Sequence, residues 1–223
     1  MEGKPWRIES PAASITDNVE QATLALRLGI AVNAMRAVQK FFYNFKDGPG
    51  PAGERDRLWA FLIAMGYLKE AIELLRPKFP VIKELALKGG AASETVDAAA
   101  GLLSGKSPLS PVLDRLRNKL VFHWDEEPIR EYAKKFTGNE VVWAEGVGDT
   151  NGEMLYRAPA NALTNSLLPD DPNEPDTPER NRERIAALMK EAGRATNLLA
   201  ELFDRAIGGH LKQHDTRTVE ETT

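Results

Sequence analysis

Apolar residues that recur every three or four positions over long stretches are the feature that most limits what this chain can fold into. The clearest stripe occupies positions Leu24, Leu28, Ala31, Met35, Val38 and Phe42. This spacing places side chains on one face of an α-helix, whereas a half-buried strand requires strict alternation. The pattern therefore predicts a fold built mainly from long helices.

Capping residues and helix breakers predict where the first two helices begin and end. The first is expected to begin after Asp17, because Asp17 and Glu20 have the spacing of a capping box, and to stop at the Gly- and Pro-rich residues 47–53. The second is expected over about residues 54–76, ending before Pro77. Its middle is apolar on nearly every face, which predicts the most buried helix.

Three further helices are expected along the chain. A weaker, alanine-rich helix covers about residues 93–104. Ser110, followed by proline, is a good N-cap for a fourth helix that runs toward His123. Pro178 opens the last long helix in the same way, and the Gly208-Gly209 pair is expected to stop it.

One segment interrupts the helical pattern. Residues 140–157 contain two short apolar runs and an Asn151-Gly152 turn signal, which together predict a β-hairpin. The polar residues 209–223 are expected to form a frayed tail. The predicted fold is therefore all-α: an antiparallel helical bundle of about five main helices, with a small hairpin inserted near 140–157, in a single domain over 1–223.

Composition excludes several classes of function. The 29 Lys and Arg residues against 33 Asp and Glu give a net charge of −4, which argues against nonspecific duplex binding. The absence of cysteine excludes disulfides, thiolate metal sites and a cysteine nucleophile. No P-loop or dinucleotide fingerprint occurs, and no cofactor is expected.

The sequence also lacks membrane and targeting signals. Its longest apolar run, Leu58 to Leu68, has about half of the ~20 residues needed to span a bilayer. Its first ten residues contain no apolar core typical of a signal peptide. We therefore expect a soluble, cytoplasmic protein that does not enter a membrane.

Two of the three histidines, His210 and His214, are spaced i, i+4. On a helix this spacing could place two imidazoles on one face for a metal ion. Because the pair follows a double glycine in a polar segment, two solvated tail histidines are the favoured interpretation, and no metal site is expected. The Glu-x-x-His motif of di-iron bundles is absent.

The third histidine belongs to a more specific motif. Arg117 is followed directly by Asn118, and five residues lie between Arg117 and His123. This pattern resembles the signature of the HEPN superfamily. Arg205 and His210, with four residues between them, also fit the spacing of the signature, but Ala206 stands in place of the polar residue. The resemblance implies a helical domain that forms a homodimer with the motif at its interface, and RNA as its ligand.

The chemistry of the motif suits metal-independent RNA cleavage. His123 can exchange protons near neutral pH and so serve as general acid or base, while the permanently charged Arg117 binds the scissile phosphate. Asn118 would orient the phosphate or the imidazole, and Asp125 is a candidate for fixing the imidazole tautomer. The resemblance implies an endoribonuclease of toxin or defence type, with an antitoxin protein as a further candidate partner. Two flanking cations are candidate phosphate-binding residues: Arg115 and Lys119.

Other interpretations remain open at this point. Arg117 and His123 also suit a solvated helix C-terminus, where the helix dipole favours cations. A noncatalytic protein-interaction module would bind a partner through the hairpin and predicts an exposed apolar patch there, at Trp143, Met154 and Tyr156. A small-molecule pocket inside the bundle is the third alternative.

Overall fold

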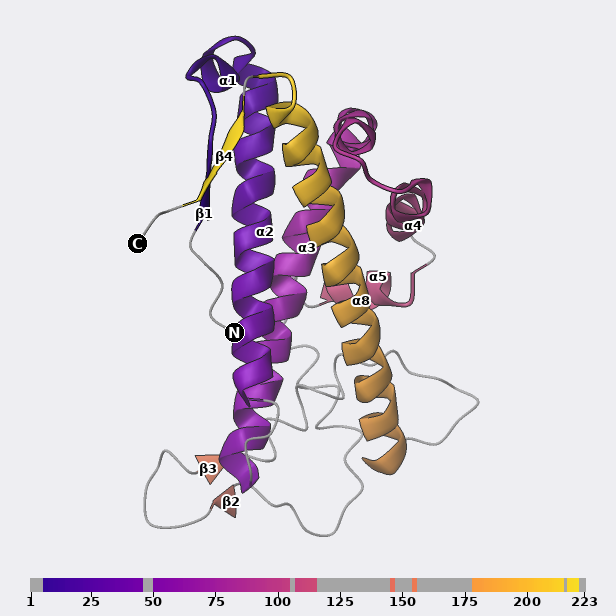
Figure 1. Cartoon of the computed structure of the whole chain (residues 1–223). Coiled ribbons are helices and arrows are strands. Elements are labelled where there is room, and N and C mark those ends of the chain that lie inside the picture. Colours follow the sequence, from indigo (N-terminus) through magenta and orange to yellow (C-terminus); the bar gives the residue numbers. More distant parts are fainter. Residues whose placement is uncertain are drawn as a thin grey trace. The chain divides into compact units, whose positions relative to one another are not determined.

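The computed structural model describes residues 6–45, 50–104, 107–115, 145–146, 154–155, 178–214 and 216–220 (Figure 1). Its fold class is all-α, a helical bundle, which confirms the prediction. The strands are β1 (Trp6–Glu9), β2 (Glu145–Gly146), β3 (Met154–Leu155) and β4 (Arg217–Glu220). The helices are α1 (Ala13–Thr16), α2 (Val19–Phe45), α3 (Gly50–Lys88), α4 (Ser93–Leu103), α5 (Leu109–Arg115) and α8 (Pro178–Leu211).

The contacts of the chain divide it into two compact units, and the division falls within α2, α3 and α8. The first unit comprises Met1–Ala34, Ala71–Ser104 and Asn197–Thr223. The second comprises Met35–Glu70 and Gly105–Thr196. Each unit is described by itself below, and the single domain over 1–223 stays a prediction.

The first unit has a core of aliphatic side chains and one phenylalanine. Helices α2, α3, α4 and α8 all contribute to it, as expected for amphipathic helices that bury one stripe each. The fully or almost fully buried members include Leu28, Val32, Leu75, Ile82, Leu85, Val96, Ala99, Leu199, Leu202 and Phe203.

The backbones of α3 and α8 approach each other closely where two glycines lie at the helix crossing. A Cβ atom on Gly89 would meet the carbonyl oxygen of Arg205 and lie 2.7 Å from its carbonyl carbon. A Cβ atom on Gly209 would likewise meet the carbonyl oxygen of Leu85, 2.8 Å from its carbonyl carbon. Only glycine permits so close an approach of two backbones.

This crossing corrects the predicted end of the last helix. Helix α8 runs through Gly208 and Gly209 to Leu211 instead of stopping at the double glycine. Gly209 is buried at the crossing. The glycine pair therefore serves close packing within the helix, where its sequence alone indicated a C-terminal cap.

The segment expected to be a frayed polar tail contains a strand. β4 pairs antiparallel with β1, with Arg7 opposite Val219 and Ile8 opposite Thr218, and Figure 1 draws the two strands side by side. The hydroxyl of Thr216 hydrogen-bonds to that of Ser10 at 3.1 Å, just before this ribbon. The expectation that residues 209–223 are frayed is therefore wrong for the described part, which continues α8 to Leu211 and forms β4.

The second unit buries apolar residues from the other halves of the long helices and from α5. The central part of α3 contributes most of them. Their positions are Met35 and Val38 on α2, Ala60, Phe61, Leu62, Met65 and Leu68 on α3, Leu109, Val112 and Leu113 on α5, and Ala192 and Ala195 on α8.

Helix α3 is less uniformly buried than its sequence predicts. Leu62, Met65 and Leu68 are fully buried, but a second face of the same segment is exposed. Trp59, Ile63 and Tyr67 keep 39%, 39% and 45% of their surface accessible. The apolar residues on all faces of this segment therefore do not indicate complete burial.

The same helix continues past Pro77, which was expected to end it. Pro77 and Pro80 both lie inside α3 and are exposed. Each costs about 3 kcal/mol in a helix interior, because it removes one backbone hydrogen bond and crowds the preceding turn. Burial of Leu75, Ile82 and Leu85 on the opposite face offsets this cost, since each contributes about 1.5–3 kcal/mol.

A glycine-dependent cap terminates α3. Gly90 has a φ of 90°, and the amide of Ala91 donates to the carbonyl of Ala86 at 2.8 Å, which together form a Schellman motif. In the last turn the ammonium of Lys88 donates to Glu84 at 2.7 Å. This hydrogen bond, helped by the charge of Lys88, lowers the pKa of Glu84 from its usual value.

The start of α2 differs from the prediction by one residue. Its N-cap is Asn18, whose side-chain oxygen accepts a hydrogen bond from the amide of Gln21 at 3.0 Å. Asp17 instead donates its backbone amide to Ala13, at the end of α1. Both residues are good N-caps, so the sequence alone did not distinguish them.

The predicted hairpin is present in the part of it that the structure describes. β2 pairs antiparallel with β3, with Glu145 opposite Leu155 and Gly146 opposite Met154. The remaining residues of the 140–157 segment, including Trp143 and Tyr156, lie outside the described residues. Among the described helices, none has a stretch long and apolar enough to cross a membrane.

Candidate functional site

Helix α5 leads into the segment that carries the Arg-Asn-x4-His motif. It begins at Leu109, two residues before the start expected from Ser110 as N-cap, and the amide of Leu109 donates to the hydroxyl of Ser107 at 3.3 Å. Its apolar face is almost completely buried, with Leu109 and Val112 at 1% exposure and Leu113 at 2%. The beginning of the helix is therefore held firmly in the core of the second unit.

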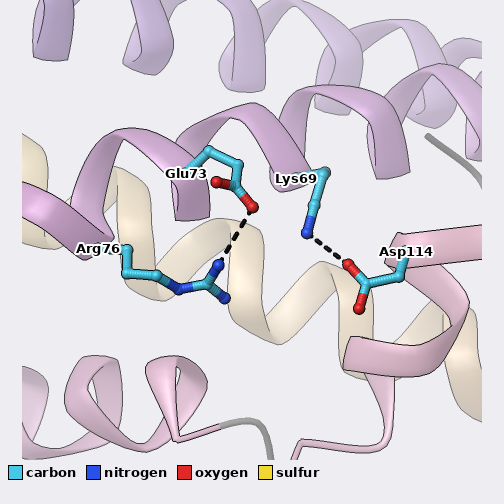
Figure 2. Close-up of polar contacts among 4 residues, drawn as sticks. All are labelled: Lys69, Glu73, Arg76 and Asp114. Carbon is cyan, nitrogen blue, oxygen red and sulfur yellow. Dashed lines mark hydrogen bonds and ion pairs between the residues drawn. The ribbon is translucent and has the colours of Figure 1, made fainter. Parts of the chain in front are cut away.

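An ion pair connects this helix to α3. The ammonium of Lys69 contacts a carboxylate oxygen of Asp114 at 2.5 Å (Figure 2). Lys69 is only 8% exposed, whereas the Asp114 side chain is largely exposed. A hydrogen bond to a charged group contributes more than one between neutral groups, so this pair helps to orient α5 three residues before Arg117.

Of the six residues predicted for the site, the structure describes one. Arg115 ends α5, where it is exposed and has a polar or electrostatic partner. The other predicted residues lie outside the described part of the chain: Arg117, Asn118, Lys119, His123 and Asp125. Their convergence on one phosphate stays a prediction.

The second Arg–His pair that fits the signature, Arg205 and His210, does not form a shared site. Arg205 is exposed on α8, whereas His210 on the same helix is only 4% exposed. The Nε2 atom of His210 lies 2.8 Å from the backbone carbonyl oxygen of Ser14. Arg205 and His210 therefore face different surroundings and cannot bind one phosphate together.

His210 also corrects the interpretation of the C-terminal histidines. It was expected to be solvated in a tail, but it lies buried near the end of α8. The stripe of buried residues at Leu199, Phe203 and Ala206 continues to His210 at steps of three and four. That periodicity was the sequence signal for a buried histidine, and the double glycine obscured it.

Other charged groups of the described region form surface interactions. Arg76 donates to Glu73 at 3.3 Å across one turn of α3, as Figure 2 also shows. Near the start of α8, Arg180 and Arg184 are partly buried and each has a polar or electrostatic partner. Such pairs are usual on helix surfaces and do not indicate a binding site.

Comparison of the chain with known proteins found no similar protein. No protein-family model matches the chain, and no match is found among the curated proteins or the solved structures.

Proposed function

We propose that this protein is a HEPN-like RNA-binding protein that cleaves RNA without a metal ion. The observation that carries the proposal is the Arg117-Asn118-x4-His123 motif in an all-α chain. Helix α5 ends two residues before Arg117. The buried apolar face of α5 and the Lys69–Asp114 pair would fix the position of the helix from which the motif continues.

Helix geometry favours a site made by two copies of the chain. Residues six apart on a regular helix differ by about 120° in direction and about 9 Å in height. Arg117 and His123 of one copy would therefore not reach one phosphate if the helix continues. A homodimer solves this problem, because Arg117 of one copy can lie beside His123 of its partner in a common cleft.

Two copies of the motif would supply all the groups needed for RNA transesterification. One His123 removes the proton from a ribose 2′-hydroxyl, which attacks the adjacent phosphorus. The same His123 then gives this proton to the 5′-oxygen as its bond to phosphorus breaks. Arg117 stabilises the negative charge that builds up on the phosphate. The products are a 2′,3′-cyclic phosphate and a free 5′-hydroxyl.

Cleavage of a labelled single-stranded RNA pool in excess EDTA tests this function. We expect wild-type protein to produce cyclic phosphate ends, and His123→Ala to lose about 10²- to 10⁴-fold in rate, the usual contribution of a general acid or base. Arg205→Ala is the matched control, because it removes an exposed arginine that also precedes a histidine, five positions away, but lacks the polar residue after it. It should cleave at the wild-type rate.

Mixed subunits test the shared cleft. Arg117→Ala and His123→Ala should each be inactive alone, but a mixture forms heterodimers in which one site has an intact Arg117 and an intact His123. Mixing should therefore restore part of the wild-type activity. Activity that survives His123→Ala in a folded protein would refute the catalytic assignment, and a mixture without activity would refute the shared site.

A noncatalytic interaction module is the second candidate. It is favoured by the exposed apolar stripe on α3, where Trp59, Ile63 and Tyr67 recur every four residues on one face. Exposed apolar surface of this kind is typical of partner-binding helices. Folded wild-type protein that neither cleaves nor binds the RNA pool would favour this candidate.

A further inference from the structure

The C-terminal end of α8 contains a buried nitrogen atom whose role the fold does not explain. The Nε2 atom of His210 lies 2.8 Å from the carbonyl oxygen of Ser14. A carbonyl oxygen can only accept, so Nε2 carries a proton, and in the neutral ring Nδ1 then has a lone pair. This Nδ1 atom is buried and has no hydrogen-bond partner among the described residues. Buried polar atoms are normally paired, so an orphan one suggests a missing ligand.

A second imidazole lies beside the ring that carries this nitrogen. The ring centroids of His210 and His214 are 5.4 Å apart, with an angle of 64° between the ring planes. Two imidazoles bound to one tetrahedral ion have centroids roughly 5–5.5 Å apart, because each metal–nitrogen bond is about 2.0–2.1 Å long. The two rings are therefore already separated as two ligands of one ion would be.

We propose that Nδ1 of His210 and the imidazole of His214 bind a divalent transition-metal ion. Imidazole nitrogen suits zinc, nickel and copper, and an i, i+4 histidine pair is a known arrangement for zinc. The Ser14 carbonyl plays the part of an outer-shell acceptor, which fixes the ring and the tautomer of a ligating histidine. The site also lies at a helix C-terminus, where the dipole favours a cation.

The residues around the two imidazoles determine how many ligands the protein offers to the ion. Within the described residues, no group of three or more His, Asp or Glu side chains is placed to hold a metal ion. Two imidazoles fill two of the four positions that zinc usually takes, which leaves the other two open to further ligands. His214 lies beyond the last helical residue, Leu211, and is partly exposed, so its ring can turn to admit the ion. The bound ion would link the turn at His214 to the buried ring of His210.

Isothermal titration of the EDTA-stripped full chain with Zn²⁺ at pH 7.5 tests this site. The wild type should bind one ion per chain, and its thermal midpoint should rise with Zn²⁺ and fall back when EDTA is added. His214→Ala should weaken binding at least about tenfold and abolish the thermal shift. His214 is used because the buried His210 is also needed for packing, and His214→Gln provides a second variant.

His123→Ala is the matched control, because it removes the one other histidine of a chain that has no cysteine. It should bind Zn²⁺ as the wild type does. Absence of saturable binding, equal binding by His214→Ala, or loss of binding in His123→Ala would each overturn the proposal. Because the RNA assay is performed in excess EDTA, the metal site and the proposed nuclease activity can fail independently.

Discussion

The crossing of α3 and α8 at Gly89 and Gly209 predicts opposite effects of alanine at the two adjacent glycines of α8, Gly208 and Gly209. A Cβ atom at Gly209 would lie 2.8 Å from the carbonyl carbon of Leu85 and 2.9 Å from the amide nitrogen of Gly89. Real Cβ atoms essentially never approach other atoms more closely than 3.0 Å. The neighbouring atoms belong to the backbone, so no side-chain rotation can relieve the overlap.

Gly209→Ala should therefore destabilise the protein although alanine is the better helix former. Overpacking of a closely packed contact costs about 1–3 kcal/mol, and backbone contacts place this case at the upper end. We expect a net loss of about 2 kcal/mol, which corresponds to a decrease of about 4–8 °C in Tm for a chain of this size. Thermal and urea unfolding followed by circular dichroism measure both quantities.

Gly208→Ala is the matched control in the same turn of α8. A Cβ atom at Gly208 would have no atom within 4 Å. Replacing glycine by alanine in an open helix interior should increase stability by about 0.5–1 kcal/mol. If Gly209→Ala proved as stable as Gly208→Ala, the two backbones would not be in contact, and our reason for the helix continuing through the double glycine would be wrong.

The double variant Gly89→Ala/Gly209→Ala tests whether both glycines serve one contact. The two overlaps occur at the same crossing, so a single separation of the helices would relieve both. The combined loss of stability should therefore be clearly smaller than the sum of the two single losses. Additive losses would indicate two independent contacts.

Two further changes probe the other described contacts. Asp114→Ala should reduce the free energy of unfolding by about 1–2 kcal/mol, because it removes the carboxylate that pairs with the nearly buried Lys69. The double variant Lys69→Met/Asp114→Ala should recover most of that loss in urea unfolding. A double variant as unstable as Asp114→Ala would contradict a charge effect. Asn18→Ala should lower the stability of the protein by about 1 kcal/mol, because it removes the N-cap of α2. Asp17→Ala should change the stability by no more than about 0.5 kcal/mol. If thermal unfolding showed the larger loss for Asp17→Ala, Asp17 would be the N-cap instead.

Local sequence patterns predict the residues of the candidate site but not the distant residues that contact it. The motif at Arg117, Asn118 and His123 can be recognised from residue types and spacing alone. Whether Lys69 pairs with Asp114 could not be predicted, because the two are 45 positions apart and each alone is an ordinary charged residue. The environment of His210 depends in the same way on Ser14, which is 196 positions away.

The sequence by itself determined the helical class and the approximate position of every main helix, because a stripe of apolar residues at steps of three and four suits only an amphipathic helix. Only the tertiary structure decided where α3 and α8 end. Pro77 and Gly209 both act as local breakers, but long-range packing outweighs them: buried leucine and isoleucine side chains offset the proline, and a closely approaching backbone requires the glycine. The helix penalty is about 1 kcal/mol for glycine and about 3 kcal/mol for proline, and burial across a helix interface exceeds it.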